Sequence, residues 1–208
     1  AISEDFGSDD AADRRLLALE DAAFAALNLA LQADALLLTV PDGADLNDIA
    51  ALNINLAARR LQTSRIHIRA GKNSRSAFWI DYRVSRKGAQ LPVITVDAAD
   101  GAQVDVALWF QGEGGTAQVA QAAVQQANNS RVRLNALQAG GDLLRLDIHS
   151  ELHGEGTHFA FGGIQHLRDS QIADYHLNVR HHTENSESHQ IVRGALDDNA
   201  QGYFDGTI

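Results

Sequence analysis

The chain has 208 residues, enough for one domain with a complete hydrophobic core, and 45% of them are apolar. Its formal net charge of −10 argues against nucleic-acid binding and against docking onto an anionic membrane. Cysteine is absent, so the chain can form no disulfide and can offer no thiolate to a metal or a cluster.

The sequence shows neither a membrane span nor a secretory signal. No stretch approaches the roughly 18 consecutive apolar residues that a span requires, and no basic segment leads into an apolar one. We therefore expect a cytoplasmic protein. Methionine is also absent, and residues 203–208 have the pattern of a strand in progress. These two features predict a piece of a longer protein, truncated at the C-terminus.

The N-terminal part is predicted to be a lead-in followed by one helix. Residues 1–10 are polar and acidic and contain Gly and Ser, a composition typical of a flexible segment. Over residues 11–32 the apolar spacing becomes helical, and no Gly or Pro interrupts it. The stripe that defines this helix consists of Leu17, Phe24, Leu27 and Leu31.

From residue 34 the hydrophobic period changes to two and stays near two up to residue 208. The pattern predicts about ten short strands, each with one apolar and one polar face, separated mostly by Gly, Asn, Asp or Ser. The clearest apolar runs are Leu36, Leu38 and Val40; Ile66 and Ile68; Phe78, Ile80, Tyr82 and Val84; Val104, Val106, Leu108 and Phe110; Val132, Leu134 and Ala136; Leu144, Leu146, Ile148 and Leu152; Phe159 and Phe161; Tyr175, Leu177 and Val179.

Two architectures fit this pattern about equally: an antiparallel sandwich or barrel, and an irregular parallel β-helix. Hairpin turns would favour the first, but two-residue turns with clean flanking alternation do not recur. The segment Thr116–Asn128 is ambiguous in itself. Its Ala and Gln content favours a helix, whereas alternation around Val119 would suit a buried strand with small side chains.

The last part of the chain carries a recognisable order of short motifs. A Ser-x-Gln stretch is followed by a basic residue with Gly-x-Leu, then by an acidic turn, an Ala-x-Gly and a Phe-x-Gly-x-Ile strand. These are Ser188-His189-Gln190, Arg193-Gly194-Ala195-Leu196, Asp197-Asp198, Ala200-Gln201-Gly202 and Phe204-Asp205-Gly206-Thr207-Ile208. The chain resembles the SufB/SufD family of the SUF iron–sulfur cluster assembly machinery in this signature. Arg193 stands where that family usually has Lys, and Tyr203 where it usually has Val.

Weaker matches extend the resemblance to roughly residues 20–208, and their order and spacing together carry it. They are Phe24-x-x-Leu27-Asn28, Val40-Pro41-x-Gly43, Gly140-Gly141 with Arg145, Leu152-x-Gly154-Glu155-Gly156, and residues 171–182 with Asp174 and His176. The resemblance implies a right-handed parallel β-helix over residues 33–208. It implies that Thr116–Asn128 is a coil of that β-helix. It also implies that residues 1–32 are the end of an N-terminal helical region.

The same resemblance implies a function. SufB-type subunits are the main cluster scaffold and usually supply thiolates, so a chain without cysteine is better interpreted as SufD-like. We expect a non-catalytic scaffold subunit that pairs with a SufB-like subunit and works with a SufC-like ATPase, which would dock on a region outside this chain. A homodimer is a further possibility. We expect no cofactor on this chain alone, with the Fe–S cluster and ATP belonging to the whole complex.

Histidines concentrate in the last third of the chain and form two candidate sites. By strand alternation, His149, Glu151 and His153 share one outward face with Asp147, and such residues could hold a metal ion. The alternative for this face is a solvated or partner-facing polar strand. The second set is His176, Arg180, His182 and Glu184, which the resemblance implies lie near the subunit interface where clusters form. Ordinary exposed side chains at a strand end are the alternative there.

A carbohydrate-active β-helix enzyme is the competing function. It would use clustered carboxylates, and Asp147 with Glu151 could form such a pair. The chain has only two lysines, Lys72 and Lys87, and its Gly112-Glu113-Gly114-Gly115 stretch matches no nucleotide-binding loop. We therefore assign no catalytic residues.

Overall fold

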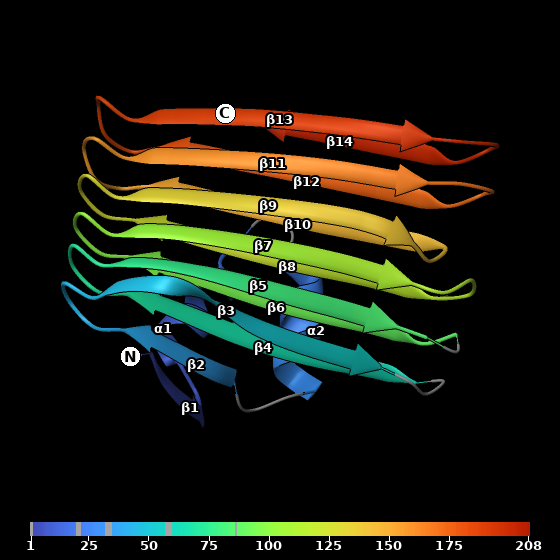
Figure 1. Ribbon diagram of the computed structural model, residues 1–208, viewed down its shortest axis with the longest axis horizontal. Coiled ribbons are helices and arrows are strands. Elements are labelled where there is room, and N and C mark those ends of the chain that lie inside the picture. Colours follow the sequence, from blue (N-terminus) through green and yellow to red (C-terminus); the bar gives the residue numbers. More distant parts are fainter. Residues whose placement is uncertain (1, 20–21, 32–34, 57–59, 86) are drawn as a thin grey trace.

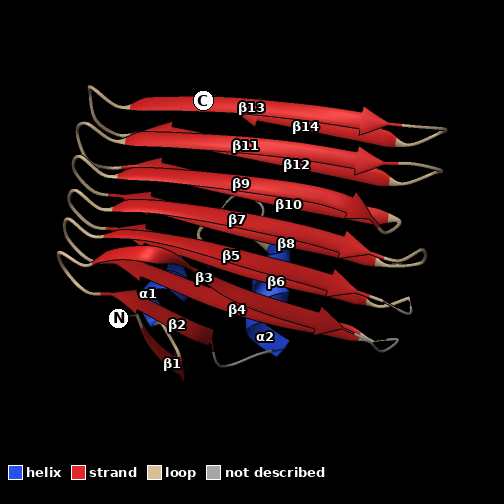
Figure 2. Ribbon diagram, viewed as in Figure 1, coloured by secondary structure: helices blue, strands red, loops and turns tan. Residues whose placement is uncertain are grey.

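The computed structural model describes residues 2–19, 22–31, 35–56, 60–85 and 87–208 (Figures 1 and 2). No helix in this part of the chain is long and apolar enough to cross a membrane. The elements are β1 (Ser3–Gly7), α1 (Asp10–Leu17), α2 (Ala23–Leu31), β2 (Ala35–Val40), β3 (Asp45–Leu56), β4 (Leu61–Ala70), β5 (Arg75–Val84), β6 (Ala89–Ala98), β7 (Gln103–Gly112), β8 (Ala117–Gln126), β9 (Arg131–Gly140), β10 (Leu143–Leu152), β11 (His158–Leu167), β12 (Ile172–His181), β13 (Glu187–Leu196) and β14 (Gln201–Thr207).

From β2 onward the strands alternate between two stacked sheets (Figure 1). Sheet A has the order β1-β2-β4-β6-β8-β10-β12-β14, and sheet B has the order β3-β5-β7-β9-β11-β13. Each strand from β2 to β12 pairs in parallel with the strand two positions later in the chain, whereas β1 pairs antiparallel with β2. The chain therefore winds as a parallel β-helix, which confirms the expected fold class and excludes the antiparallel sandwich.

The core lies between the two sheets and is built from ladders of aligned side chains. One ladder of sheet A consists of Ile66, Ile94, Ala122, Ile148 and Leu177, one from each of the strands β4, β6, β8, β10 and β12. All five are buried. Side chains of a strand alternate between its two faces. The residues before and after each ladder residue on its own strand therefore point outward. The same register thus fixes the core and aligns the polar residues on the outside.

The turns from sheet A to sheet B stack on one another at one end of the coils. Each places one residue in the left-handed region of backbone space. In the turns before the last one, the N–H of this residue donates to a carbonyl of the next coil, as from Asn73 to Asp100 at 2.9 Å. The residues in this conformation are Gly43, Asn73, Gly101, Asn129, Gly156 and Asn185. Asn and Gly are the residue types that tolerate it. The Asn and Gly punctuation of the sequence therefore marks corners of the solenoid.

The N-terminal segment differs from the prediction in two respects. Ser3–Gly7 lies in the expected flexible lead-in but forms β1, because its backbone pairs with the edge of β2. The predicted single helix over residues 11–32 is two helices, and α1 ends at the C-cap residue Ala18.

The helices pack on the outer face of sheet A. The side that packs is not the predicted apolar stripe. The stripe is between 38% and 55% exposed at all four positions, Leu17, Phe24, Leu27 and Leu31. Leu16, Ala25 and Asn28 are buried instead. The reason lies in the sheet beneath, where Arg65 and His67 point outward from β4, so the packed side of the helices needs polar and small side chains.

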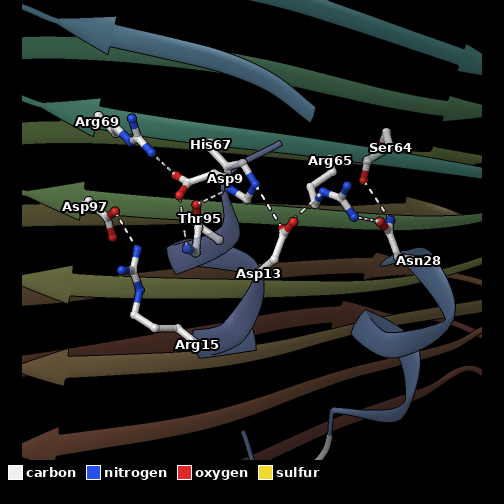
Figure 3. A network of polar contacts seen from close by, with 11 residues as sticks. Asp9, Asp13, Arg15, Asn28, Ser64, Arg65, His67, Arg69, Thr95 and Asp97 are labelled. Carbon is white, nitrogen blue, oxygen red and sulfur yellow. Dashed lines mark hydrogen bonds and ion pairs between the residues drawn. The ribbon is translucent and has the colours of Figure 1, made fainter. Parts of the chain in front are cut away.

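A buried polar network joins the helices to the sheet (Figure 3). Asp13 Oδ1 of α1 lies 3.4 Å from both Arg65 Nε and His67 Nε2. His67 Nδ1 lies 2.6 Å from the Thr95 hydroxyl. The Asn28 side-chain amide of α2 donates to the backbone carbonyl of Leu91 at 2.6 Å, and its oxygen accepts from Arg65 at 3.4 Å.

Two further ion pairs, Arg69 with Asp9 and Arg15 with Asp97, join the same surfaces (Figure 3). Salt bridges and hydrogen bonds therefore contribute to the position of the helical segment, together with a small apolar contact made by Leu16, Ala25, Val93 and Ala123.

Candidate functional site

Beyond the helices, the outer face of sheet A carries ionisable side chains in register. Leu146 and Ile148 of β10 point into the core. The residues that alternate with them along β10 point outward and align with residues of β12. The aligned pairs are Arg145 with Asp174, Asp147 with His176, His149 with Asn178 and Glu151 with Arg180.

A compact group of three side chains, Glu151, His153 and His182, lies where β10 and β12 end. The register aligns Leu152 with His181, so the residues that follow them, His153 and His182, lie at corresponding positions of two stacked turns. Their imidazole rings stack with centroids 4.3 Å apart and planes 16° apart. His182 Nε2 lies 2.5 Å from Glu151 Oε2, and one potential ligand atom from each of the three residues lies within 4.8 Å of the others.

The surroundings of this group hold His153 and Glu151 in place. Gln125 of the preceding coil contacts His153, with its Oε1 2.7 Å from His153 Nε2. Arg180 Nη1 lies 3.8 Å from Glu151 Oε1. Burial lowers the pKa of His153, and the neighbouring His182 adds to this effect, while Glu151 opposes it. Imidazole and carboxylate groups at this spacing can share a proton or bind a divalent cation.

A second polar set lies nearer the start of the same strands. His176 Nε2 is 2.7 Å from Asp174 Oδ2, and Arg145 Nε is 2.9 Å from Asp147 Oδ1. Burial raises the pKa of Asp147, although Arg145 lowers it in part. His149 is only 9% exposed and lines a shallow pocket with His176, Asn178, Asp205 and Thr207.

In the last coil, side chains at inward-pointing positions are exposed to solvent. Phe204 of β14 aligns with Tyr175, which is fully buried, yet Phe204 is 45% exposed because no strand of the described chain lies beyond it. Within the part of the chain that the structure describes, the terminal strands β13 and β14 each pair with one neighbour. Several large apolar side chains are exposed here, namely Ile191, Leu196, Tyr203, Phe204 and Ile208.

Over residues 53–208, well over half its length, the sequence matches the family described as SUF system FeS cluster assembly, SufBD core domain. The chain belongs to this SufBD core family. A comparison with curated proteins gives no match. The matched region begins within β3 and includes every later strand, so it contains both the Glu151–His153–His182 group and the exposed last coil.

In this SufBD core, the structure regroups the residues that the sequence singled out. Of the three metal candidates, Glu151 and His153 lie together, whereas His149 points into the shallow pocket. His182 joins Glu151 and His153. His176 lies six residues earlier along β12, a separation of about 20 Å at the usual rise per residue. Glu184 is exposed in the turn after β12.

The competing pair of carboxylates is not assembled in the SufBD core. Asp147 and Glu151 lie four residues apart on one strand, which separates them by about 13 Å, more than the spacing of a glycosidase pair. Each contacts a cation instead, Asp147 with Arg145 and Glu151 with Arg180.

From the sequence alone, His153 and His182 fall in different sets, because the number of residues in one coil is not known. The two residues are one coil apart, the offset that aligns Leu143 with Ile172. Gln125 was missed for the same reason, since it aligns with Glu151 on the preceding coil. A search for donors at intervals of one coil would have found the group.

Proposed function

We propose that this chain is the core of a non-catalytic, SufD-like scaffold subunit in a cytoplasmic SUF iron–sulfur cluster assembly complex. It would pair with a SufB-like subunit and work with a SufC-like ATPase. The observation that carries the proposal is the family match over residues 53–208, which coincides with the continuous stack of parallel coils.

The interior of the solenoid supports a role in binding proteins. Aliphatic and aromatic side chains from both sheets fill the space between them, including Phe78, Phe110, Phe159 and Tyr175. Activity therefore has to lie on the outer faces or at the ends of the coils. Solenoid proteins commonly use such surfaces to bind partners.

The absence of cysteine favours a SufD-like subunit over a SufB-like subunit. The 208 residues include no cysteine, and iron–sulfur clusters are held mainly by thiolates. In this proposal the cluster's sulfur ligands come from the SufB-like partner, and this chain contributes shape and polar groups beside the shared interface.

We place the SufB-like partner at the last coil. The outer edges of β13 and β14 offer backbone N–H and C=O groups that a strand from another chain can pair with. Phe204 occupies an inward position that a further layer would cover. The ATPase would bind the parent protein outside residues 1–208.

The test is co-expression of the parent protein with its SufB-like and SufC-like partners, followed by molar-mass measurement on a sizing column. We expect a hetero-complex that contains all three. The chain limited to residues 1–208 should retain the SufB-like subunit and lose the ATPase. Elution of the parent alone, or only as a homodimer, would contradict the proposal.

A substitution at the last coil locates the interface. Phe204→Asp should abolish binding of the SufB-like subunit, because it places a charge where the partner's apolar surface would pack. Ile164→Asp is the matched control. Ile164 is 51% exposed on the outer face of β11, which pairs with the edge strand β13, and its substitution should leave the complex intact.

A further inference from the structure

We propose that Glu151, His153 and His182 bind one divalent transition-metal ion of the zinc class. This site lies on the side of sheet A, and the proposal is independent of the scaffold function. It would make this chain a metal-binding protein through nitrogen and oxygen ligands, without any thiolate.

The donor set suits such an ion. Two imidazoles and one carboxylate are a recurrent set of three protein ligands for Zn²⁺, which leaves a position for water. Among the residues that the structure describes, this is the group of three or more histidine and acidic side chains whose ligand atoms lie within 4.8 Å of one another.

The backbone fixes both histidines. The N–H of His153 donates to the Gln126 carbonyl, and the N–H of His182 donates to the Leu152 carbonyl, each at 3.0 Å. Both residues are therefore anchored to the ends of paired strands. Ligands on rigid elements lose little conformational entropy when they bind an ion.

The hydrogen bonds around the group orient the ligand residues. Gln125 Oε1 can only accept, so His153 Nε2 carries the proton and its Nδ1 holds the free lone pair. Such a second hydrogen bond is typical of metal-bound histidine. His182 Nε2 lies 2.5 Å from Glu151 Oε2, within hydrogen-bond distance. When the ion binds, it takes a nitrogen lone pair from each neutral imidazole and an oxygen from the carboxylate, and each imidazole keeps its one proton on the other ring nitrogen.

Two features oppose binding and set its strength. Ligands around a tetrahedral Zn²⁺ lie about 3.3 Å apart, so atoms spread over as much as 4.8 Å must move closer together. Side chains of His153 and His182 are exposed enough to move in this way. Arg180, 3.8 Å from Glu151, places a positive charge beside the ion. Its replacement should therefore tighten binding.

Sheet B provides a matched control of the same composition. Glu187 lies 3.1 Å from His158 and 3.8 Å from His189, so two histidines flank one carboxylate there as well. The potential ligand atoms of these three residues do not all lie within 4.8 Å of one another, unlike those of Glu151, His153 and His182. Removing His158 and His189 deletes as many imidazoles as removing His153 and His182.

The experiment is calorimetric titration of the tag-free chain with Zn²⁺, supported by the visible absorption of Co²⁺, which reports the coordination number. We expect one ion per chain. His153→Ala with His182→Ala should weaken binding by at least about 100-fold, and Glu151→Gln by about tenfold or more. His158→Ala with His189→Ala should leave binding unchanged, and Arg180→Gln should strengthen it.

Several outcomes would overturn the proposal: no binding, binding of equal strength in the two double variants, or Co²⁺ spectra with only solvent-like octahedral bands. Circular dichroism of each variant checks the fold. Should the His153 and His182 double variant fail to fold, Glu151→Gln, which preserves shape, decides the question alone. Unchanged affinity in that variant would exclude the carboxylate as a ligand and contradict the site.

Discussion

At the scale of single residues, buried charges contribute to holding the helices on the solenoid. Arg65 has a side chain that is 1% exposed, and Asp13 and Asn28 contact it from α1 and α2. A buried charge that loses its counter-ion is strongly destabilising, because its desolvation is no longer compensated. This network is therefore where substitutions should have the largest effect.

Asp13→Ala should lower the free energy of unfolding by about 3 kcal/mol, because it removes a carboxylate that lies 3.4 Å from the buried Arg65 guanidinium. Urea denaturation measures this change, and hydrogen exchange of α1 and α2 shows whether the helices detach first. Asp10→Ala is the control. Asp10 is exposed in the same first turn, and its loss should cost only about 0.5 kcal/mol through the helix dipole. Equal effects would show that the network contributes nothing specific.

His67 should make stability depend on pH. Burial lowers its pKa below the ordinary value of 6.5, although Asp13, Asp9 and Asp97 raise it, and Arg65 lowers it further. The unfolded chain therefore binds more protons just below pH 6.5, so stability falls as the pH drops through this window. His67→Gln removes the titrating group.

Urea denaturation at pH 7.5 and at pH 5.5 checks this prediction. Between these values the native sequence should lose more stability than His67→Gln does. Identical losses in the two proteins would show that His67 carries no such dependence.

The residue scale also shows what the sequence could not reveal. Strand alternation was sufficient to place Glu151 and His153 on one outward face. The partnership with His182 depends on the coil-to-coil register, which is a long-range property. The failure of the predicted helical stripe has a similar origin, because the face that packs is selected by Arg65 and His67 of a distant strand.

At the scale of elements, tertiary pairing overrides local propensity in β8. The Ala- and Gln-rich segment is a strand because β6 and β10 pair with it on both sides. Its small residues Ala120 and Ala122 fill the core, and Gln118 donates its side-chain amide to the Tyr82 carbonyl at 3.2 Å. The family resemblance predicted this strand, whereas the composition of the segment alone favoured a helix.

The stacked turns leave no room for a side chain at Gly154. An added Cβ would lie 2.1 Å from the backbone nitrogen of Asn128, so the two turns would have to separate. Gly154→Ala should therefore lower the free energy of unfolding by about 1–3 kcal/mol, measured by urea denaturation.

Gly114 serves as the control for this effect. A Cβ there meets nothing within 4 Å, and Gly114→Ala should change stability by no more than about 0.5 kcal/mol. Equal tolerance at the two positions would contradict close stacking of the sheet A to sheet B turns.

At the scale of the whole molecule, each coil contacts mainly its neighbours, and the interior is filled. This arrangement leaves the outer faces of the two sheets and the ends of the coils for function, among them the open polar part of sheet A with Glu151, His153 and His182, and the last coil. The alternation of apolar and polar residues in the sequence is equally compatible with an antiparallel sandwich. It does not distinguish the two folds, because parallel pairing joins residues nearly thirty positions apart. The motif order around residues 188–208 provided the missing information.

The central claim is that the protein supports cluster assembly on a SufB-like partner. The most direct measurement is the iron and acid-labile sulfide bound to that partner, purified from cells with the SufC-like ATPase and with or without the protein that contains this chain. The account predicts that cluster content falls when the protein is absent or carries Phe204→Asp, and that Ile164→Asp preserves it. Equal cluster content in all four samples would contradict the scaffold role.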